Sequence, residues 1–249
     1  MPRYKLLIEY AGTAYKGWQK QPNAPTVEGE IEAAFARILQ QPVDVIGQGR
    51  TDSGVHAEEQ IAHVDYAEEL DLYRLQYALN GILPDDIAIW RMEKVDDEFH
   101  ARFDALYRRY RYQISRRPHP LRRETSTLVM QELDMQAMDY CAALIKGTHH
   151  FDSFTKPDNQ NPSAQCRVTL SEFRQEGPLL TYHIQANRFV RHLVRRLVGT
   201  MLQVGRGKRE AAEFEDMLLK PSKDKNGFGA AARGLILDKV GYETLDDEG

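Results

Sequence analysis

Two kinds of apolar spacing alternate along this chain, and their order restricts the folds that it can adopt. In RYKLLIEYAG, from residue 3 to residue 12, apolar side chains recur at every second position, which is typical of a strand with one buried face. After Thr26, a residue suited to a helix N-cap, Val27, Ile31 and Phe35 recur every four positions, as they do on one face of a helix. Strand spacing then returns at 42–48, 60–66, 87–95 and 106–115, with a helical stripe at 72–83. This order predicts an α/β (α+β) fold.

The second half of the chain has the same alternation. Asp134 can cap a helix, and two strand-like segments, 166–173 and 179–187, flank a turn at Glu176-Gly177-Pro178. Phe189, Leu193 and Leu197 then step by four, which predicts a helix over 189–204. We therefore expect two similar halves built on antiparallel sheet flanked by helices, with an active-site cleft between them. The boundary is expected in the proline- and arginine-rich segment 116–126, which gives halves of 1–115 and 116–249.

Composition is ordinary for a globular protein, with 42% hydrophobic and 28% charged residues. The sequence contains no apolar run of about 18 residues, so no membrane span is expected. Its 2 cysteines, Cys141 and Cys166, do not form a CxxC pair. They favour buried, unreactive thiols in a reducing compartment, and hence a cytoplasmic protein.

Charge is segregated along the chain although the net charge is only −4. From Arg102 to Arg123 there are 8 arginines and 1 acid, whereas from Asp85 to Glu98 there are 6 acids and 2 basic residues. Such a distribution favours one basic face that attracts a polyanion. The alternative is that the arginines solvate a sheet surface and pair with the acidic segments.

The segment GQGRTDSGVHA, 47–57, contains the strongest candidate for chemistry, Asp52. Thr-Asp-Ser-Gly is also good turn chemistry, so Asp52 alone could be structural. Two features favour a functional role. Arg50 lies two positions away and projects from the same face if this part is extended, and glycines at 47, 49 and 54 would allow close approach of a bulky ligand.

Two other enzyme classes fit this segment poorly. An aspartic protease needs a second D-[ST]-G carboxylate to share a proton, and the sequence has no second copy of that motif. The glycines at 47 and 49 also lack the third glycine of a dinucleotide-binding loop and do not open a helix.

The segment YRRYRY, 107–112, sorts its residues onto two faces if it is a strand. Tyr110 and Tyr112 lie on one face, and Arg109 and Arg111 lie on the other. Tyrosines beside bases can stack on them and arginines can bind phosphates, although tyrosines in a core and arginines in water fit the pattern equally well. On the expected helix 189–204, an arginine that reached inward would need a carboxylate partner, and Asp52 is available.

Five segments in this order resemble the tRNA pseudouridine synthase A family. They are YAGTAYKGWQKQ, GRTDSGVHA, ALNGILPDDIAI, FHARFDALYRRYRYQI and NRFVRHLVRRLVGTMLQVG. The GRTD-x-GVHA segment is the most specific of them, and together they span most of the chain.

The resemblance implies an isomerase that converts uridine to pseudouridine at tRNA positions 38 to 40, in the anticodon arm, without a metal or an organic cofactor. At the matching positions, Asp52 would be the nucleophile, Tyr110 would pack against the target base and Arg195 would be the partner of the Asp52 carboxylate. Arg50 corresponds to the arginine associated with moving the base out of the helix. Binding of tRNA would also involve Arg109 and Arg111. The family further implies a homodimer with a basic cleft for tRNA.

A non-catalytic RNA-binding module is the competing hypothesis, because two α/β halves with an aromatic and basic strand would also serve binding alone. Asp52 and Arg195 discriminate between the two hypotheses. A protein that only binds RNA has no need of a buried acid, whereas an ionised aspartate can serve as a nucleophile.

Overall fold

The computed structural model describes residues 1–155 and 163–243, and the chain forms two compact units. The first unit contains Met1–Leu106 and Leu237–Gly249, and the second contains Tyr107–Ile236. The chain therefore passes between the units twice, the second time within its last strand.

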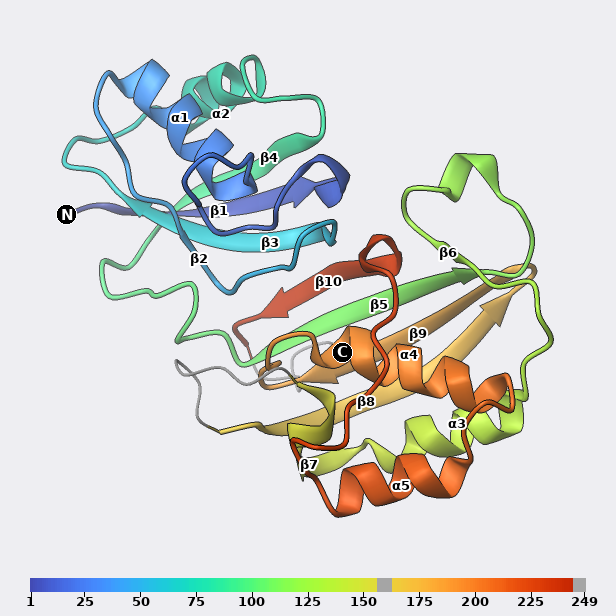
Figure 1. Ribbon diagram of the computed structural model, residues 1–249. Coiled ribbons are helices and arrows are strands. Elements are labelled where there is room, and N and C mark those ends of the chain that lie inside the picture. Colours follow the sequence, from blue (N-terminus) through green and yellow to red (C-terminus); the bar gives the residue numbers. More distant parts are fainter. Residues whose placement is uncertain (156–162, 244–249) are drawn as a thin grey trace. The chain divides into compact units, whose positions relative to one another are not determined.

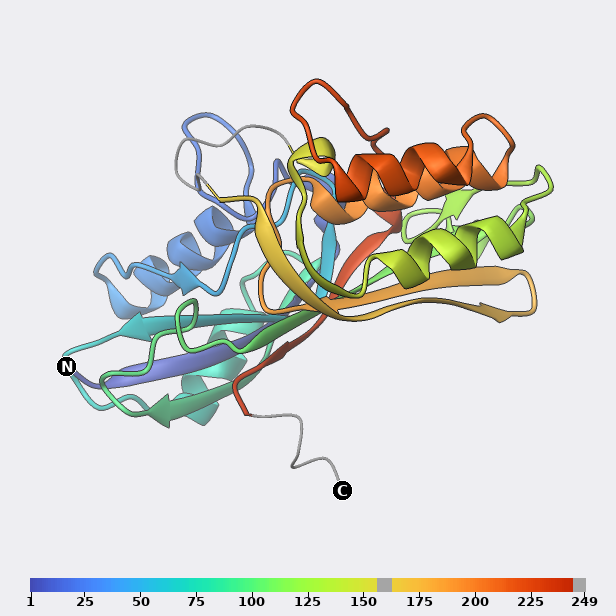
Figure 2. The ribbon, with the colours of Figure 1, turned by 90° about the horizontal axis from the view of Figure 1, so that it is seen from below.

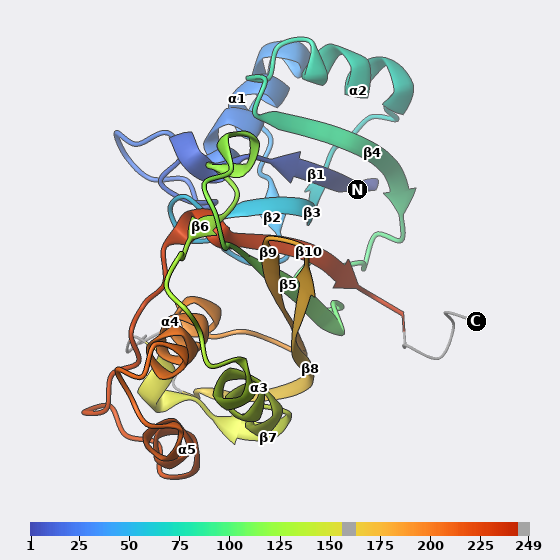
Figure 3. The ribbon, with the colours of Figure 1, turned by 90° about the vertical axis from the view of Figure 1, so that its right-hand side faces the viewer.

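In the first unit, two helices cover one face of a sheet (Figure 1). Its elements are β1 (Arg3–Tyr10), the short 3-10 helix η1 (Gly12–Ala14), α1 (Val27–Leu39), β2 (Ile46–Gly47), β3 (His56–Asp65), α2 (Leu72–Asn80), β4 (Ile87–Val95) and most of β10 (Leu235–Gly241). The strand order is β4-β1-β3-β10, and β2 pairs with β3 beside this path. Strand β1 is antiparallel to both β3 and β4. Helices α1 and α2 lie side by side over these strands (Figure 3).

The core of the first unit lies between this sheet and its helices. Alternate residues of β1, among them Leu6 and Ile8, are fully buried, as the two-residue spacing predicts. Ile31 and Phe35 of α1 are also fully buried, as is Leu79 of α2. The apolar stripes of the two helices therefore pack against the apolar face of the sheet.

The second unit has three helices on one face of its sheet (Figure 2). Its elements are β5 (Tyr107–Ser115), η2 (Pro120–Arg122), β6 (Thr127–Leu128), α3 (Met135–Leu144), β7 (Gly147–His150), η3 (Asp152–Phe154), β8 (Gln165–Glu176), β9 (Leu179–Ala186), α4 (Leu193–Gly205), α5 (Ala211–Leu219) and η4 (Ala232–Gly234). The strand order is β5-β9-β8-β7 with antiparallel pairing, and β6 runs parallel to β5. The side chain of Asp134 caps α3 by accepting a bond from the Ala137 amide at 2.9 Å.

The α/β class and the antiparallel sheet with flanking helices are confirmed, but two predicted elements differ in extent. Of the strand expected over 42–48, only Ile46–Gly47 pairs in the sheet. Helix α4 begins at Leu193 rather than at residue 189, because His192 has a left-handed backbone with φ of 63° that stops the helix from extending toward the N-terminus. The compact units also divide at Leu106/Tyr107, so the tyrosine-rich strand β5 lies in the second unit.

Both cysteines are buried, and burial raises the pKa of Cys141 to about 12 and that of Cys166 to about 11. These thiols are therefore protonated and unreactive at neutral pH. In the part of the chain that the structure describes, no helix has the length and apolar character needed to cross a membrane.

Candidate active site

Asp52 lies in the loop between β2 and β3, and its side chain is half-buried. The Asp52 carbonyl oxygen accepts a hydrogen bond from the Val55 amide at 3.1 Å, which closes the turn. The Tyr15 carbonyl oxygen accepts two more bonds from this turn, one from the Gly54 amide at 3.3 Å and one from the Ser53 hydroxyl at 3.2 Å. The turn is thus fixed to the segment that follows η1.

Thr51 fixes the other side of Asp52. Its side chain is buried, and its hydroxyl shares a 2.8 Å hydrogen bond with the hydroxyl of Tyr10 on β1. The Thr51 carbonyl oxygen accepts a bond from the Trp18 amide at 3.2 Å. The backbone on both sides of Asp52 is therefore hydrogen-bonded to neighbouring elements, and the Asp52 side chain is partly exposed.

Two of the glycines in this segment serve the packing of the protein itself. Gly54 has φ of 76°, which few other residues adopt, in the turn after Asp52. A Cβ at Gly47 would lie 2.7 Å from the indole ring of Trp18. The close approach that glycine allows at Gly47 is therefore to Trp18, whereas we expected a ligand.

Arg50 is exposed, and its Nε donates a 2.7 Å hydrogen bond to Oε1 of Gln19. The side-chain Nε2 of Gln19 in turn donates to Oε2 of Glu28 at 2.7 Å. Glu28 lies in the first turn of α1, is only 6% exposed, and also accepts bonds from the Trp18 indole and the Lys20 amide. Burial raises the pKa of Glu28 above its usual range. A buried carboxylate thus orders the segment that contacts Arg50.

Tyr110 lies on β5, opposite Ile184 of β9, and its side chain is 9% exposed. Its ring meets the ring of Phe189 edge-on, with centroids 5.1 Å apart and an interplanar angle of 89°. Tyr112, on the same face of β5, is fully buried. Arg109 and Arg111 alternate with the tyrosines and are half-buried. The two-sided pattern expected for this strand is therefore present.

Arg195 lies near the start of α4 and is half-buried. Its Nε donates a 2.9 Å hydrogen bond to the Ala230 carbonyl oxygen, and the Ala230 amide donates to the Arg195 carbonyl oxygen at 2.8 Å. The next residue, Ala231, accepts a bond from the Tyr112 hydroxyl at 2.9 Å. Burial raises the pKa of Tyr112, and the positive charge of Arg195 opposes this shift. Arg195 and the tyrosine face of β5 are therefore neighbours within the second unit.

The structure gathers the predicted site residues in two groups. Asp52 and Arg50 belong to the first unit, whereas Tyr110, Arg109, Arg111 and Arg195 belong to the second. Sequence reasoning did not identify the residues that hold them. Gln19 lies within YAGTAYKGWQKQ without standing out in it, and the four-residue spacing places Phe189 on the apolar stripe of the expected helix 189–204. Ala230 acts through its backbone, so its side chain gives no signal.

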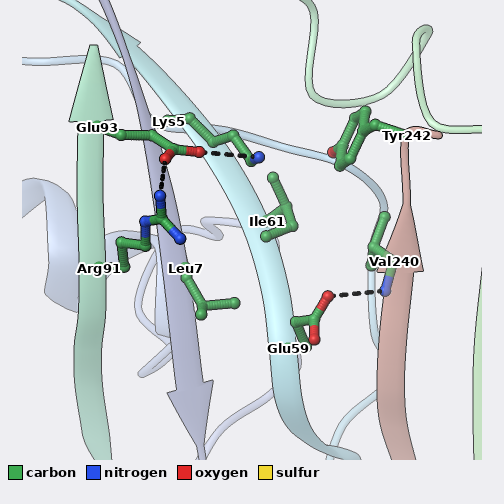
Figure 4. A pocket seen from close by; sticks show the side chains of 8 residues that line it. All are labelled: Lys5, Leu7, Glu59, Ile61, Arg91, Glu93, Val240 and Tyr242. Carbon is green, nitrogen blue, oxygen red and sulfur yellow. Dashed lines mark hydrogen bonds and ion pairs between the residues drawn. The ribbon is translucent and has the colours of Figure 1, made fainter. Parts of the chain in front are cut away.

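A cavity of about 190 Å³ opens on the first unit, and Asp52 is not among the residues that line it (Figure 4). Its lining comes from β1, β3, β4, β10 and Tyr242 just after β10. The charged groups that line it have partners within the protein, because Glu93 binds Lys5 at 3.0 Å and Arg91 at 2.7 Å, and Glu59 accepts a hydrogen bond from the Val240 amide at 3.3 Å. We therefore assign it no part in the chemistry. Among the residues that the structure describes, no three His, Cys, Asp or Glu side chains are grouped so as to hold a metal ion.

The family profile and the curated relatives that match this chain point to the same family. The profile of a family described as tRNA pseudouridine synthase matches residues 6–104 and 141–243 of this chain. These two ranges include Asp52 and Arg195, whereas Tyr110 lies between them.

Three curated relatives match over nearly their whole length, and each is named tRNA pseudouridine synthase A. The relative from Chlorobium luteolum is 39% identical over 100% of this chain and 98% of its own. The relative from Porphyromonas gingivalis is 38% identical over 97% of this chain and 98% of its own. The relative from an Exiguobacterium species is 37% identical over 99% of this chain and 100% of its own.

Proposed function

The chain belongs to the tRNA pseudouridine synthase A family, and from that premise we propose that it isomerises uridine to pseudouridine at tRNA positions 38 to 40, in the anticodon arm, with Asp52 as the nucleophile. Pseudouridine synthases are isomerases. The observation that carries the role of Asp52 is its partly exposed carboxylate on a loop whose backbone is fixed on both sides. A rigid mount keeps a reactive group in register with its substrate.

The reaction breaks the bond between N1 of uracil and C1′ of the ribose and forms a bond between C5 and C1′. The base gains a proton at N1 and loses the one at C5, so no atom is added and no electron is transferred. Asp52 can start this sequence by attack on C1′, by attack on C6 of the base, or by removing a sugar proton. All three routes need an ionised carboxylate, which an aspartate supplies at neutral pH.

The other site residues act on the same uridine. Arg195 pairs with the Asp52 carboxylate and keeps it ionised, because a neighbouring positive charge lowers the pKa of an acid. Tyr110 packs against the target base after it leaves the stack, and Arg50 assists that movement. Extrusion of a base costs a few kcal/mol, which stacking on an aromatic ring, worth about 1–3 kcal/mol, can offset. Arg109 and Arg111 contact tRNA phosphates.

The same family membership supports three further statements about the working enzyme. It acts in the cytoplasm and as a homodimer with a basic cleft for tRNA. The isomerisation transfers no electrons and takes no group from a second molecule. We therefore propose that the enzyme uses no metal and no organic cofactor.

Release of tritium from tRNA labelled at uridine C5 tests the reaction directly. The wild-type enzyme should release tritium, and mapping should place the modified nucleotides at positions 38 to 40. Asp52→Asn should release none while it binds the same tRNA with an affinity close to that of the wild type, since the substitution preserves size and removes only the ionised oxygen. Turnover by Asp52→Asn would refute the assignment of the nucleophile.

The assay also separates the isomerase from the RNA-binding module. Unmodified tRNA transcripts that bind tightly but release no tritium with either protein would favour binding alone. Release from uridines outside the anticodon arm would confirm an isomerase and contradict the proposed positions.

A further inference from the structure

The segment Gly227–Ala231, which precedes β10, is held against α4 by its backbone. The Phe228 amide donates to the Thr200 hydroxyl at 3.1 Å, and the Ala230 amide donates to the Arg195 carbonyl oxygen at 2.8 Å. The Gly227 amide donates to the Ser153 carbonyl oxygen at 2.8 Å. Three amides in five residues are thus bonded to α4 and to η3 beside it. Below, this segment is called the 227–231 segment.

This segment also holds the side chain of Arg195. Ala230 accepts a hydrogen bond from Arg195 Nε while its own amide is bonded to the backbone of the same arginine. A guanidinium is planar, so a fixed Nε–H direction also restricts the plane and direction of the two terminal nitrogens. The position of the Ala230 carbonyl therefore sets the orientation of the Arg195 charge.

Two consecutive residues of α4 determine where the 227–231 segment lies. A Cβ at Gly199 would lie 2.1 Å from the Phe228 carbonyl oxygen and 2.7 Å from the Ala230 amide nitrogen, so only glycine leaves room for the segment. Thr200 is fully buried, and its hydroxyl donates to the Arg196 carbonyl oxygen at 2.6 Å while it accepts from Phe228. Gly199 thus permits the approach, and Thr200 fixes it.

We propose that Thr200 is a positioning residue for catalysis, which acts through the 227–231 segment to orient the guanidinium of Arg195. The inference rests on the proposed function, because it takes Arg195 as the partner of the nucleophile. Thr200 itself lies inside the second unit, fully buried, and acts on the substrate only through this segment.

Thr200→Val tests the proposal, because valine keeps the shape of threonine and loses the hydroxyl. The Phe228 amide then has no acceptor at that position, and burying an unsatisfied donor is unfavourable, so the segment shifts. We expect kcat to fall about 10- to 100-fold, as misplacement of a catalytic group by about 1 Å does, with KM for tRNA within about twofold of the wild type. Thr200→Ser restores the hydroxyl and should recover most of kcat.

Ser171→Ala is the matched control. It removes another buried hydroxyl of the second unit, which donates to the Ala142 carbonyl oxygen at 2.7 Å and shares a 2.8 Å hydrogen bond with the Tyr182 hydroxyl. Among the described residues, this hydroxyl forms no hydrogen bond with Arg195 or with the 227–231 segment. It should lower thermal stability by an amount similar to that of Thr200→Val and leave kcat within about twofold of the wild type. Equal losses of kcat in both variants, or an unchanged kcat in Thr200→Val, would overturn the proposal.

A spectroscopic readout separates this proposal from the proposed function. In protein with 15N-labelled arginine, the Nε–H signal of Arg195, identified by its absence in Arg195→Lys, should exchange slowly with water because it is bonded to Ala230. Thr200→Val should shift that signal and speed its exchange, and Thr200→Ser should restore it. If wild-type protein released no tritium, the proposed function would fail while this signal would still test the positioning. A signal unaffected by Thr200→Val would refute the positioning alone.

Discussion

His63, on β3, has its imidazole buried to 1% exposure, and Nδ1 accepts a hydrogen bond from the Ala101 amide at 3.2 Å. Nε2 therefore carries the proton of the neutral ring, and it has no hydrogen-bond partner among the described residues. Burial, followed by the positive charges of Arg3 and His100, lowers the pKa of His63 to about 4. The folded protein thus excludes the charged form of this ring.

Stability should consequently depend on pH between the pKa of an unfolded histidine, about 6.5, and the folded value of about 4. In that window the unfolded chain binds a proton that the folded chain does not, so stability is full above pH 6.5 and falls as the pH falls, by at most roughly 1.4 kcal/mol per pH unit from this group. Urea unfolding of wild type and His63→Asn from pH 4 to pH 7 measures it. Asparagine keeps an acceptor near Ala101 and does not titrate, so its curve should be flatter, and parallel curves would contradict the assignment.

The residues of the site differ in how well sequence alone could identify them. Asp52 stands among glycines and small polar residues with an arginine two positions away, a pattern that a simple turn does not need. The groups that hold these residues left weaker signals. Ala230 contributes a carbonyl oxygen that every residue has, and the bonds that Trp18 and Lys20 donate to Glu28 join positions that no periodic pattern connects. Contacts of this kind depend on how the folded chain brings these residues together, so local sequence patterns do not predict them.

At the scale of elements, the late start of α4 affects the surroundings of Tyr110, the residue that we propose packs against the target base. Because the helix begins at Leu193, Phe189 lies in the connection after β9, where its ring packs edge-on against Tyr110. Such a pair contributes about 0.5–1.5 kcal/mol beyond its buried area. Phe189→Leu should therefore lower kcat/KM about 2- to 10-fold, since it leaves an apolar side chain but frees the Tyr110 ring.

A double-mutant cycle isolates this contact. Phe189→Leu should have almost no effect on kcat/KM when Tyr110 is already replaced by leucine, because the ring that it orients is then absent. Leu128→Ala, at an exposed position of the same unit, serves as a control and should leave kcat/KM unchanged. Additive losses from Phe189→Leu and Tyr110→Leu would show that Phe189 does not act through Tyr110.

Strand β5 carries a second prediction, on its arginine face. If Arg109 and Arg111 bind phosphates, replacing either with alanine should weaken tRNA binding and reduce the slope of log K against log[salt] by about 1. Filter binding from low to moderate salt measures both quantities. Arg37→Ala, an exposed change on α1 of the other unit, should preserve the slope, and an unchanged slope in the β5 variants would place the tRNA elsewhere.

Regular elements were the part of the fold most open to prediction. In β1, β4 and β5, predicted and observed strands agree in extent to within two residues, because the apolar spacing reports a buried face. Prediction and structure differ where a single backbone angle or a short strand pairing determines where an element begins or ends. His192 begins α4 through its left-handed φ of 63°, and β2 shrinks to two paired residues, while neither event alters the apolar spacing around it.

At the scale of the whole molecule, the net charge of −4 would by itself disfavour a polyanionic partner. The arginines of 102–123 and of 188–196 lie almost wholly in the second unit, whereas the acidic segment 85–98 lies in the first. Segregation by unit places most of these arginines in the second unit, which is where we propose that tRNA phosphates bind. The overall charge therefore says little about the partner here.

Division into two units also leads to a prediction about which chains build one active site. Asp52 belongs to the first unit and Arg195 to the second, yet the chain joins these units directly at Leu106/Tyr107 and again inside β10. The proposed chemistry needs both residues and one chain carries both, so we expect each site to take them from the same chain. An enzyme that lacks Asp52 then cannot be complemented by one that lacks Arg195.

Mixing two inactive variants tests this expectation. Asp52→Asn and Arg195→Leu, unfolded together and refolded as a mixture so that subunits of any dimer exchange, should release no more tritium than either variant alone. Sites built from two chains would behave differently, because a quarter or more of the sites in such a mixture would contain both native residues and would be active. A mixture of wild type with Asp52→Asn, refolded in the same way, supplies the reference for refolding yield, since its activity should follow the fraction of wild-type chains in either arrangement.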